Sequence, residues 1–444
     1  MADIHFVTLD PGHFHASLVQ KEMYPGVAKT VHVYAPLGPD LIEHLGRVAR
    51  FNQRAQNPTS WELQVHAAPD FLEQMVRDRA GNVVVLSGRN HGKIDRVQAS
   101  LDAGMNALVD KPWILEASDL PKLERALSTA EERGLVAYDI MTERFEVTTE
   151  LQKELVNDPA TFGQLRPGTA ADPAVYMESV HNLMKVVAGA PNIRPPWFFD
   201  TEEQGEGLND IGSHLVDLVQ WTLFPEQALD YRKDVRVARA QRWPTLISRD
   251  QFRRVTGQEI PAGLAAHVKN DSLEYFCNTL VSYAVRGTNV TLNVIWDWEA
   301  PPGAGDSHFA YYRGSRARVE IRQGSADKYR TELYVVPNLP TEKAAVLAAV
   351  QARLGSPAVQ AQHPGVAVED RGAELHVTVP DRLRITHEEH FAQVTQRFLR
   401  YVRDRSTLPA WERPNMLAKY YVTTEGTALA RRAPVQVAER RAPK

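Results

Sequence analysis

The sequence is poor in several features that mark particular classes of protein. Its 444 residues include a single cysteine, Cys277, so no disulfide can form within the chain. No stretch approaches the ~20 apolar residues of a membrane-spanning helix, and the opening MADIHFVTLD reads as a strand rather than a signal peptide. The formal net charge is only −4, which gives no reason to expect nucleic acid or an anionic membrane as a partner. The composition therefore predicts a cytoplasmic protein of enzyme size without a nucleic-acid or membrane partner.

Short apolar runs alternate with amphipathic segments from Ile4 to Phe145. This alternation predicts an α/β domain over residues 1–145, with a Rossmann-like parallel sheet between layers of helices. The predicted strands are Ile4–Leu9, Val31–Tyr34, Leu63–Ala67, Val83–Leu86, Ala107–Val109 and Leu135–Tyr138, and the predicted helices are His15–Glu22, Leu41–Phe51, Asp70–Arg79, Lys93–Ala103 and Ala117–Arg133.

The rhythm of the sequence changes after Phe145. The helix Glu146–Asn157 leads into a region rich in proline and glycine, Pro167 to Pro196, which predicts loop or irregular structure. Later runs alternate apolar and polar residues, as antiparallel strands do when one face lies on a core. We therefore predict an α+β domain with a largely antiparallel sheet over residues 146–444. Its further predicted elements are the strands Val235–Trp243, Leu273–Arg286, Asn289–Trp298, Ala317–Gln323, Glu332–Val336 and Glu374–Val379, and the helices Gly205–Trp221, His387–Arg403 and Met416–Arg431.

The predicted helix Gly205–Trp221 carries a candidate for proton chemistry. Asp210 and His214 are four residues apart, so on a helix they lie one turn apart on the same face. A histidine titrates near neutral pH, and a carboxylate beside it holds the ring and stabilises its charged form. Asp217 could reach the same side. The pattern fits a capped surface helix as well, because an acid near a helix N-terminus is favoured by the dipole.

The turn after the first predicted strand lacks most of the glycine fingerprint of dinucleotide-binding folds. Of G-x-G-x-x-G only the second glycine, Gly12, is present, with Asp10 at the first position and His15 at the third. The second strand ends without the acid that grips an adenosine ribose, and the nearest acid is Asp40. The choice between NAD and NADP is therefore open. His13 and His15 fit a solvated polar turn as well as a cofactor or metal contact.

Two short motifs, one in each predicted domain, carry a family resemblance. Gly104–Pro112 reads GMNALVDKP, and Gly207–Asp217 reads GLNDIGSHLVD. The first is similar to A-G-k-h-V-l-x-E-K-P and the second to G-G-x-x-x-D-x-G-x-H-x-x-D. Both signatures belong to the Gfo/Idh/MocA family, the glucose–fructose oxidoreductase and inositol dehydrogenase group. The segment with Lys185–Gly189 and Pro195–Asp200 resembles a branch of predicted oxidoreductases in that family with a C-terminal domain of its own.

The resemblance implies an NAD(P)-dependent dehydrogenase of carbohydrate metabolism. Such an enzyme transfers hydride between a nicotinamide cofactor and a hydroxyl or keto carbon of a sugar, sugar acid or polyol. By position, His214 is the implied acid/base, Lys111 the group that hydrogen-bonds the reacting oxygen, and Asp210 the residue that orients the site. The residues expected at NAD or NADP are Asp10, Gly12, His13, Phe14, His15, Ser87, Asn90, Asp110 and Lys111, and those expected at the substrate are His181, Lys185, Trp197, Asp210 and His214.

The sequence departs from the family pattern at Lys93, which aligns with a family histidine. No metal is assigned, because the histidines lack a compact spacing such as H-E-x-x-H.

Two other functions fit the same residues. Some relatives oxidise a sugar transiently with a tightly bound NAD and then eliminate, so that the net reaction is glycosidic cleavage, and the altered turn Asp10–His15 fits a recycled cofactor. A catalytically silent sugar-binding paralogue is the third reading, although the retained Lys111, Asp210 and His214 argue against it. The family commonly forms oligomers, so a homo-oligomer, dimer or tetramer, is expected.

Overall fold

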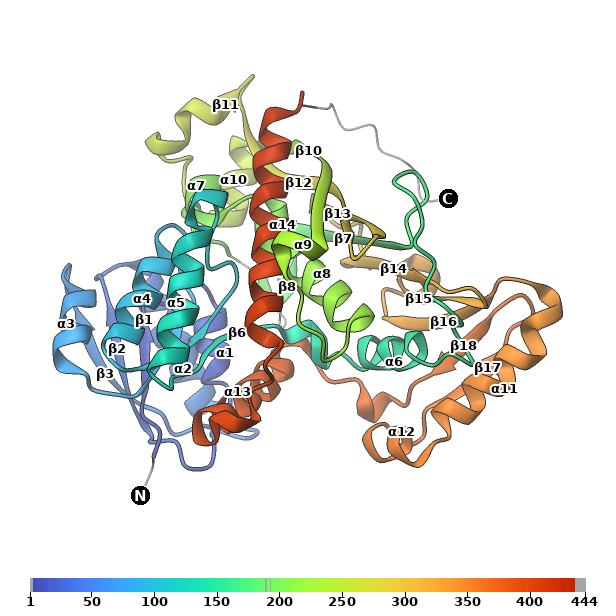
Figure 1. Cartoon of the computed structure of the whole chain (residues 1–444). Helices are drawn as coiled ribbons and strands as arrows, with labels where there is room; N and C mark the ends of the chain where they lie inside the picture. Colours follow the sequence, from blue (N-terminus) through green and yellow to red (C-terminus); the bar gives the residue numbers. More distant parts are fainter. Residues whose placement is uncertain (1–2, 188–189, 192, 436–444) are drawn as a thin grey trace. The chain divides into compact units, whose positions relative to one another are not determined.

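The structure is a computed structural model that describes residues 3–187, 190–191 and 193–435, and its chain divides into two compact units (Figure 1). Unit 1 comprises Met1–Thr142, Glu202–Gln204 and Thr386–Tyr420. Unit 2 comprises Glu143–Thr201, Gly205–Ile385 and Tyr421–Lys444. The domain limits 1–145 and 146–444 stay a prediction.

Unit 1 is built on a six-stranded parallel sheet, as the alternation of apolar runs predicts. Its strand order is β3-β2-β1-β4-β5-β6, so the chain winds first to one side of β1 and then to the other. The point of reversal, between the carboxyl ends of β1 and β4, is where such sheets bind ligands. The strands are β1 (Phe6–Leu9), β2 (Thr30–Ala35), β3 (Glu62–Ala67), β4 (Val83–Leu86), β5 (Asn106–Val109) and β6 (Ala137–Asp139).

The helices of unit 1 form two groups. The helices α3, α4 and α5 contact one another in sequence, and α1 contacts both α2 and α13. Two helical layers around a parallel sheet confirm the predicted doubly wound class. The helices are α1 (His15–Val19), α2 (Pro39–Gln53), α3 (Phe71–Asp78), α4 (Lys93–Asp102), α5 (Leu120–Glu132) and α13 (His387–Arg403), with the 3-10 turns η1 (Ala117–Asp119) and η8 (Arg405–Thr407).

Unit 2 holds a ten-stranded sheet that is antiparallel except where β13 pairs with β7. Its order is β10-β12-β13-β7-β14-β15-β16-β18-β17, with β11 also paired to β12. This largely antiparallel sheet confirms the predicted α+β class. The strands are β7 (Val175–Met184), β10 (Val235–Ser248), β11 (Val268–Lys269), β12 (Ser272–Val285), β13 (Thr288–Glu299), β14 (Ser307–Arg313), β15 (Ala317–Gln323), β16 (Glu332–Pro337), β17 (Ala367–Asp370) and β18 (Leu375–Thr378), and β8 (Val186–Val187) pairs with β9 (Ala190–Pro191).

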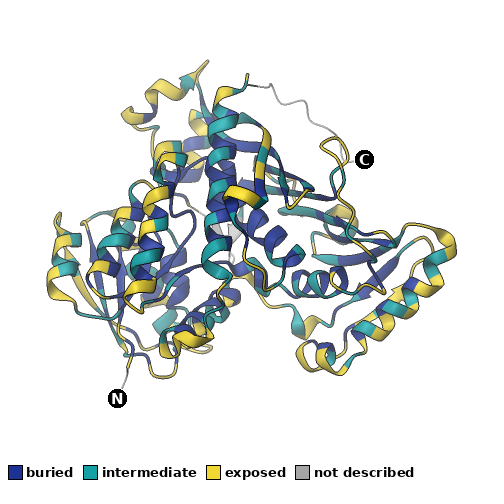
Figure 2. Cartoon of the chain, viewed as in Figure 1, coloured by how far each residue is buried: buried dark blue, intermediate teal, exposed yellow. Residues whose placement is uncertain are grey.

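Helices of unit 2 pack on this sheet and at its ends. The helix α8 contacts β7, β12 and β13, and its neighbour α6 contacts β15 and β16. Exposed residues gather instead on α11 and α12 (Figure 2). The helices are α6 (Val147–Val156), α8 (Gly207–Leu223), α9 (Tyr231–Asp234), α10 (Arg249–Thr256), α11 (Lys343–Leu354) and α12 (Pro357–Gln362), with the 3-10 turns η3 (Pro196–Phe199), η4 (Ala262–His267), η5 (Ser325–Asp327), η6 (Pro340–Glu342) and η7 (Asp381–Leu383).

Three elements have residues in both units. They are η2 (Thr142–Phe145), α7 (Thr201–Gln204) and α14 (Glu412–Arg432). Among the described helices, none is both long and apolar enough to cross a bilayer.

The prediction of loop or irregular structure for Pro167–Pro196 is wrong at Val175–Met184, which forms β7. This strand lies inside the sheet, paired in parallel with β13 and antiparallel with β14. Pro173 precedes the strand and Pro191 follows it, so the prolines bound it and cost it no ladder hydrogen bond. Counting proline and glycine over the whole region therefore concealed the alternating apolar pattern between them.

Close packing of α8 against the sheet depends on its first residue. A Cβ added to Gly207 would lie 1.9 Å from the carbonyl oxygen of Cys277 on β12, so only glycine fits there. Glu206 caps the helix in a capping box with Asn209. The helix thus begins directly against β12, and this contact fixes where along the strand the residues of its second turn lie.

Candidate functional site

The turn after β1 lacks the glycine fingerprint, and its backbone instead lies close to the backbone that follows β4. Asp10 adopts φ +48°, the left-handed conformation that a glycine adopts most easily, and its N–H donates to the carbonyl of Tyr34. A Cβ on Gly88, just after β4, would lie 2.0 Å from the carbonyl oxygen of Asp10. The glycine that lets two backbones meet is therefore at the end of β4. The carboxylate of Asp10 lies 3.5 Å from the guanidinium of Arg96, which offsets its charge.

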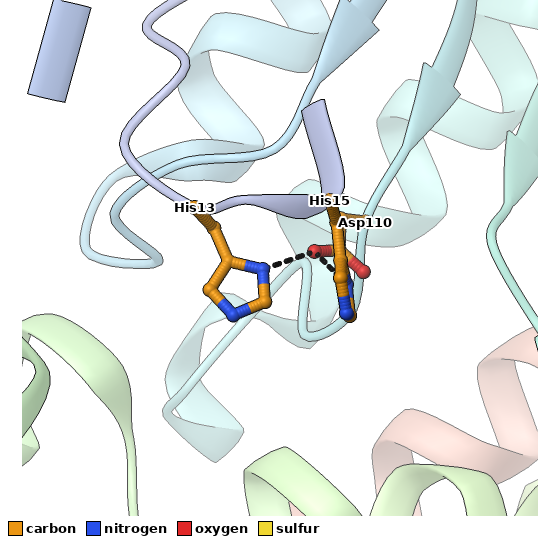
Figure 3. Close-up of side chains that lie close together, drawn as sticks. All are labelled: His13, His15 and Asp110. Atoms are coloured by element: carbon orange, nitrogen blue, oxygen red, sulfur yellow. Dashed lines mark hydrogen bonds and ion pairs between the residues drawn. The ribbon is translucent and has the colours of Figure 1, made fainter. Parts of the chain in front are cut away.

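Four of the residues expected at the cofactor meet at the carboxyl ends of β1, β4 and β5, and Figure 3 shows three of them, His13, His15 and Asp110. The Nδ1 atoms of His13 and His15 lie 3.3 and 2.9 Å from Oδ2 of Asp110, and the hydroxyl of Ser87 donates to the same oxygen at 2.8 Å. His15 and Asp110 are buried, and the side chain of His13 is 17% exposed. The family resemblance implied that these residues lie at one cofactor, but it did not predict that they contact one another.

Burial sets the protonation of this cluster. It lowers the pKa of His15 to about 3, against the opposing charge of Asp110, so the imidazole is neutral at physiological pH. Burial alone would raise the pKa of Asp110, but the positive charge that His15 and His13 carry when protonated and the hydrogen bonds of both rings outweigh it and hold that pKa well below its usual range. An ionised carboxylate thus faces two imidazole nitrogens.

A buried lysine lies behind the cluster. Lys93 is 1% exposed, and its ammonium donates to Oδ1 of Asn90 at 2.5 Å and to the backbone carbonyl of Asp110 at 3.0 Å. Burial lowers the pKa of Lys93 to about 8. The amide of Asn90 in turn donates to the backbone carbonyl of Gln204 at 2.7 Å. Lys93 was not among the predicted site residues, although its alignment with a family histidine was a usable signal.

Lys111 follows directly on this cluster and is 7% exposed. Trp113 lies two residues after Lys111 in the same turn, and its indole N–H donates to Oδ1 of Asp139 at 3.2 Å. Lys419 donates to the other oxygen of Asp139 at 2.7 Å, and Tyr420 donates to it at 2.8 Å. This buried network belongs to unit 1 and fixes the Trp113 side chain. Phe14, also expected at the cofactor, lies half-buried under the guanidinium of Arg47.

In unit 2, Asp210 and His214 lie one turn apart on α8 and are 7% and 8% exposed. They do not belong to a solvated surface helix, which was the alternative reading. Asp217 forms a bidentate ion pair with Arg144, at 2.6 and 2.7 Å, and both side chains are buried. The acid one turn after His214 is thus engaged in anchoring the helix.

Arg194 is a buried charge that interacts electrostatically with Asp210 and that the sequence did not reveal. Its Nε donates to the carbonyl of Leu183 at 3.0 Å, and its guanidinium lies 4.5 Å from the ring centre of Phe198 and 5.0 Å from that of Trp296. Burial lowers the pKa of Arg194, while Asp210 is among the groups that raise it. Stacking on aromatic faces stabilises a guanidinium away from water.

His181 and Lys185, two residues expected at the substrate, share one carboxylate that was not predicted. Asp306 accepts from Lys185 at 2.8 Å, and His181 Nδ1 lies 3.2 Å from the same oxygen. Burial would raise the pKa of Asp306, but the hydrogen bonds and charges of His181 and Lys185 lower it well below its usual range. Trp197, expected beside them, is 8% exposed in η3. Asp306 is the last residue of a Gly- and Pro-rich segment, PPGAGD, and no pattern in it pointed to the site.

Comparison with known proteins places this architecture among oxidoreductases. Residues 151–431 match the family model described as the putative oxidoreductase C terminal domain. A crystal structure of a putative oxidoreductase from Parabacteroides merdae ATCC 43184 is 44% identical, with a TM-score of 0.93, over 97% of this chain and 98% of that one. No curated protein matches the sequence significantly.

More distant solved structures share the fold and contain nicotinamide cofactors. GenD2 from gentamicin A biosynthesis, crystallised with NAD, is 14% identical with a TM-score of 0.58 over 96% of this chain and 95% of that one. KijD10, a 3-ketoreductase from Actinomadura kijaniata crystallised with NADP and TDP-benzene, is 14% identical with a TM-score of 0.55 over 95% of each chain. The family resemblance carried by the two motifs is confirmed.

Proposed function

This chain belongs to the family of the putative oxidoreductase C-terminal domain, and we propose that it is an NAD(P)-dependent dehydrogenase of a sugar, sugar acid or polyol. The observation that carries the proposal is the polar cluster of His13, His15, Ser87 and Asp110 at the reversal point of the parallel sheet. Ligands of such sheets bind at this point. The cofactors of GenD2 and KijD10 add support.

The nucleotide half of the site fits a dinucleotide in three respects. Gly12 and Gly88 leave the turn without side chains where backbones approach, and Arg96 offsets the charge of Asp10. Leu37, just beyond β2, is 78% exposed, an apolar side chain suited to an adenine face. The bound nicotinamide would supply the hydride chemistry.

The proton chemistry falls to the residues that the family motifs name. His214, held on α8, takes the proton of the substrate hydroxyl during oxidation and returns it during reduction. Asp210, one turn earlier, orients the substrate or the imidazole. Lys111 donates a hydrogen bond to the reacting oxygen and stabilises the negative charge that develops there. His181 and Lys185, fixed by Asp306, are the proposed polar contacts of the substrate.

Cofactor binding is the first test of the proposal. NAD(H) and NADP(H) are titrated separately while the melting temperature and tryptophan fluorescence are followed. Saturation at 100 times Kd stabilises the folded state by about 2.7 kcal/mol, which for a domain of this size raises the melting temperature by about 5–10 °C. If neither nucleotide changes either signal, the dehydrogenase proposal fails.

Variants and product analysis test the chemistry. His214→Asn is expected to lower kcat by about 10²–10⁴-fold while nucleotide still binds, whereas the exposed His267→Gln in the same unit serves as a matched control. Stoichiometric NADH or NADPH marks a dehydrogenase, and cleavage of a glycoside without net reduced cofactor marks the eliminating alternative. A Lys111→Ala/His214→Ala double variant that performs as the wild type would favour the silent sugar-binding paralogue.

A further inference from the structure

The cluster of His13, His15 and Asp110 has the composition of a metal site. Ligand atoms of these three side chains lie within 4.8 Å of one another (Figure 3). Two imidazole nitrogens with one carboxylate oxygen match catalytic zinc sites, which use three protein ligands and leave a fourth position open. The cluster lies entirely within unit 1.

The distances suit a small divalent ion. Ligands about 2.0–2.1 Å from a tetrahedral ion lie roughly 3.3 Å from one another. The Nδ1 atoms of His13 and His15 lie 3.3 and 2.9 Å from Oδ2 of Asp110. Both separations are within a few tenths of an ångström of this value, and the ligand atoms of all three side chains lie within 4.8 Å of one another.

The carboxylate has coordinating capacity that hydrogen bonds within the described chain leave unused. Oδ1 of Asp110 is buried and has no hydrogen-bond partner among the described residues, and Asp110 is only 3% exposed. A buried carboxylate oxygen without a partner is costly in a cluster formed by hydrogen bonds alone. Ser87 donates to Oδ2 and orients the carboxylate, as second groups around metal ligands do. Lys93 bonds the backbone carbonyl of Asp110, so its ammonium does not occupy a carboxylate oxygen.

We propose that His13, His15 and Asp110 bind one divalent transition-metal ion of the zinc class, with an open position for water or an anionic oxygen. The site goes beyond the proposed dehydrogenase function and does not depend on it. The sequence analysis assigned no metal because the histidines lack a compact spacing, and it left a cofactor or metal contact open for His13 and His15.

The test uses the full-length protein, stripped with EDTA and free of nucleotide. Zn²⁺ is titrated by calorimetry, and Co²⁺ is titrated while visible d–d absorption is followed. The wild type is expected to bind one ion per chain with intense four-coordinate Co²⁺ bands. His13→Gln and Asp110→Asn are each expected to weaken binding by at least about 10-fold. His13 is the most exposed of the three ligands, so its variant is the least prone to disturb the fold.

A second histidine pair in unit 1 supplies the control. Nδ1 of His32 lies 3.1 Å from Nε2 of His66, so this pair on β2 and β3 tests whether two neighbouring imidazoles by themselves account for the binding. His66→Gln is expected to leave the stoichiometry and the Co²⁺ spectrum unchanged. The proposal is overturned if the wild type binds no ion or if His66→Gln abolishes binding. It is also overturned if His13→Gln and Asp110→Asn, each folded with the wild-type melting temperature in the absence of metal, bind the ion as tightly as the wild type. Failure of nucleotide to bind in the separate titration would leave this result untouched.

Discussion

Replacing Asp217 with asparagine tests how the helix that carries His214 is anchored. The carboxylate of Asp217 receives Nε of Arg144 at 2.6 Å and Nη2 at 2.7 Å. The two side chains are 4% and 5% exposed, so the pair is shielded from water. Asparagine keeps the shape of the side chain but removes the charge, so the buried guanidinium loses the carboxylate of this pair.

The size of the effect follows from this burial. Removing one partner of a buried ion pair costs about 3–5 kcal/mol, because the other charge stays in a medium of low polarity. A domain of the size of unit 2 loses about 2–4 °C of melting temperature per kcal/mol, so Asp217→Asn is expected to lower its transition by about 6–20 °C. Differential scanning calorimetry at pH 7 measures this shift.

Two further variants decide whether the buried charge is the cause. Arg144→Met with Asp217→Leu removes both charges and is expected to recover most of the loss. Asp250→Asn, which breaks the surface ion pair with Arg253, is expected to change the melting temperature little. The reasoning is refuted if Asp217→Asn shifts the transition no more than Asp250→Asn, or if the double variant melts no higher than the single one.

Three other perturbations have defined outcomes. Burial lowers the pKa of His44 to about 4, so between pH 6.5 and 4 the unfolded chain binds a proton that the folded chain does not. The free energy of unfolding therefore decreases as the pH is lowered, by about 2 kcal/mol from pH 8 to pH 5. Urea titrations measure this loss, and His44→Leu is expected to abolish it. Gly88→Ala places a Cβ 2.0 Å from the carbonyl oxygen of Asp10 and should lower the free energy of unfolding by about 1–3 kcal/mol, measured in urea. Gly38→Ala is the control, because a Cβ there meets open space and should lower that free energy less. The pKa of the Asp306 carboxyl is lower in the folded than in the unfolded chain. The ionised carboxylate therefore stabilises the fold above its unfolded pKa, and this stabilisation is lost as the pH falls toward its folded pKa. The difference in melting temperature between Asp306→Asn and the wild type should shrink below about pH 4.

The class of each sheet could be predicted from the sequence because it depends on local periodicity. Short apolar runs between amphipathic helices predicted the parallel sheet, and the observed strand order places its reversal point between β1 and β4. Alternating runs predicted most of the antiparallel sheet. The strand β7 was missed because the prolines around it dominated the composition of its region, whereas its place beside β13 and β14 depends on pairing with residues far along the chain.

The sequence by itself determined that Asp210 and His214 share a helical face, because four residues make about one turn. It also placed Lys111 after a strand of the parallel sheet. Only the tertiary structure decided that Asp217 belongs to Arg144, and that Asp306 joins His181 and Lys185. These partners are distant in sequence, so strand order and register bring them together.

The turn Asp10–His15 shows the same division. Its departure from the glycine fingerprint is plain in the sequence, and read alone it weakens the case for a cofactor. The fold places the close-approach glycine at Gly88 and brings His13 and His15 to Asp110, a residue of another strand end. Local pattern specifies which side chains a turn carries, while the packing of parallel strands decides which side chains they meet.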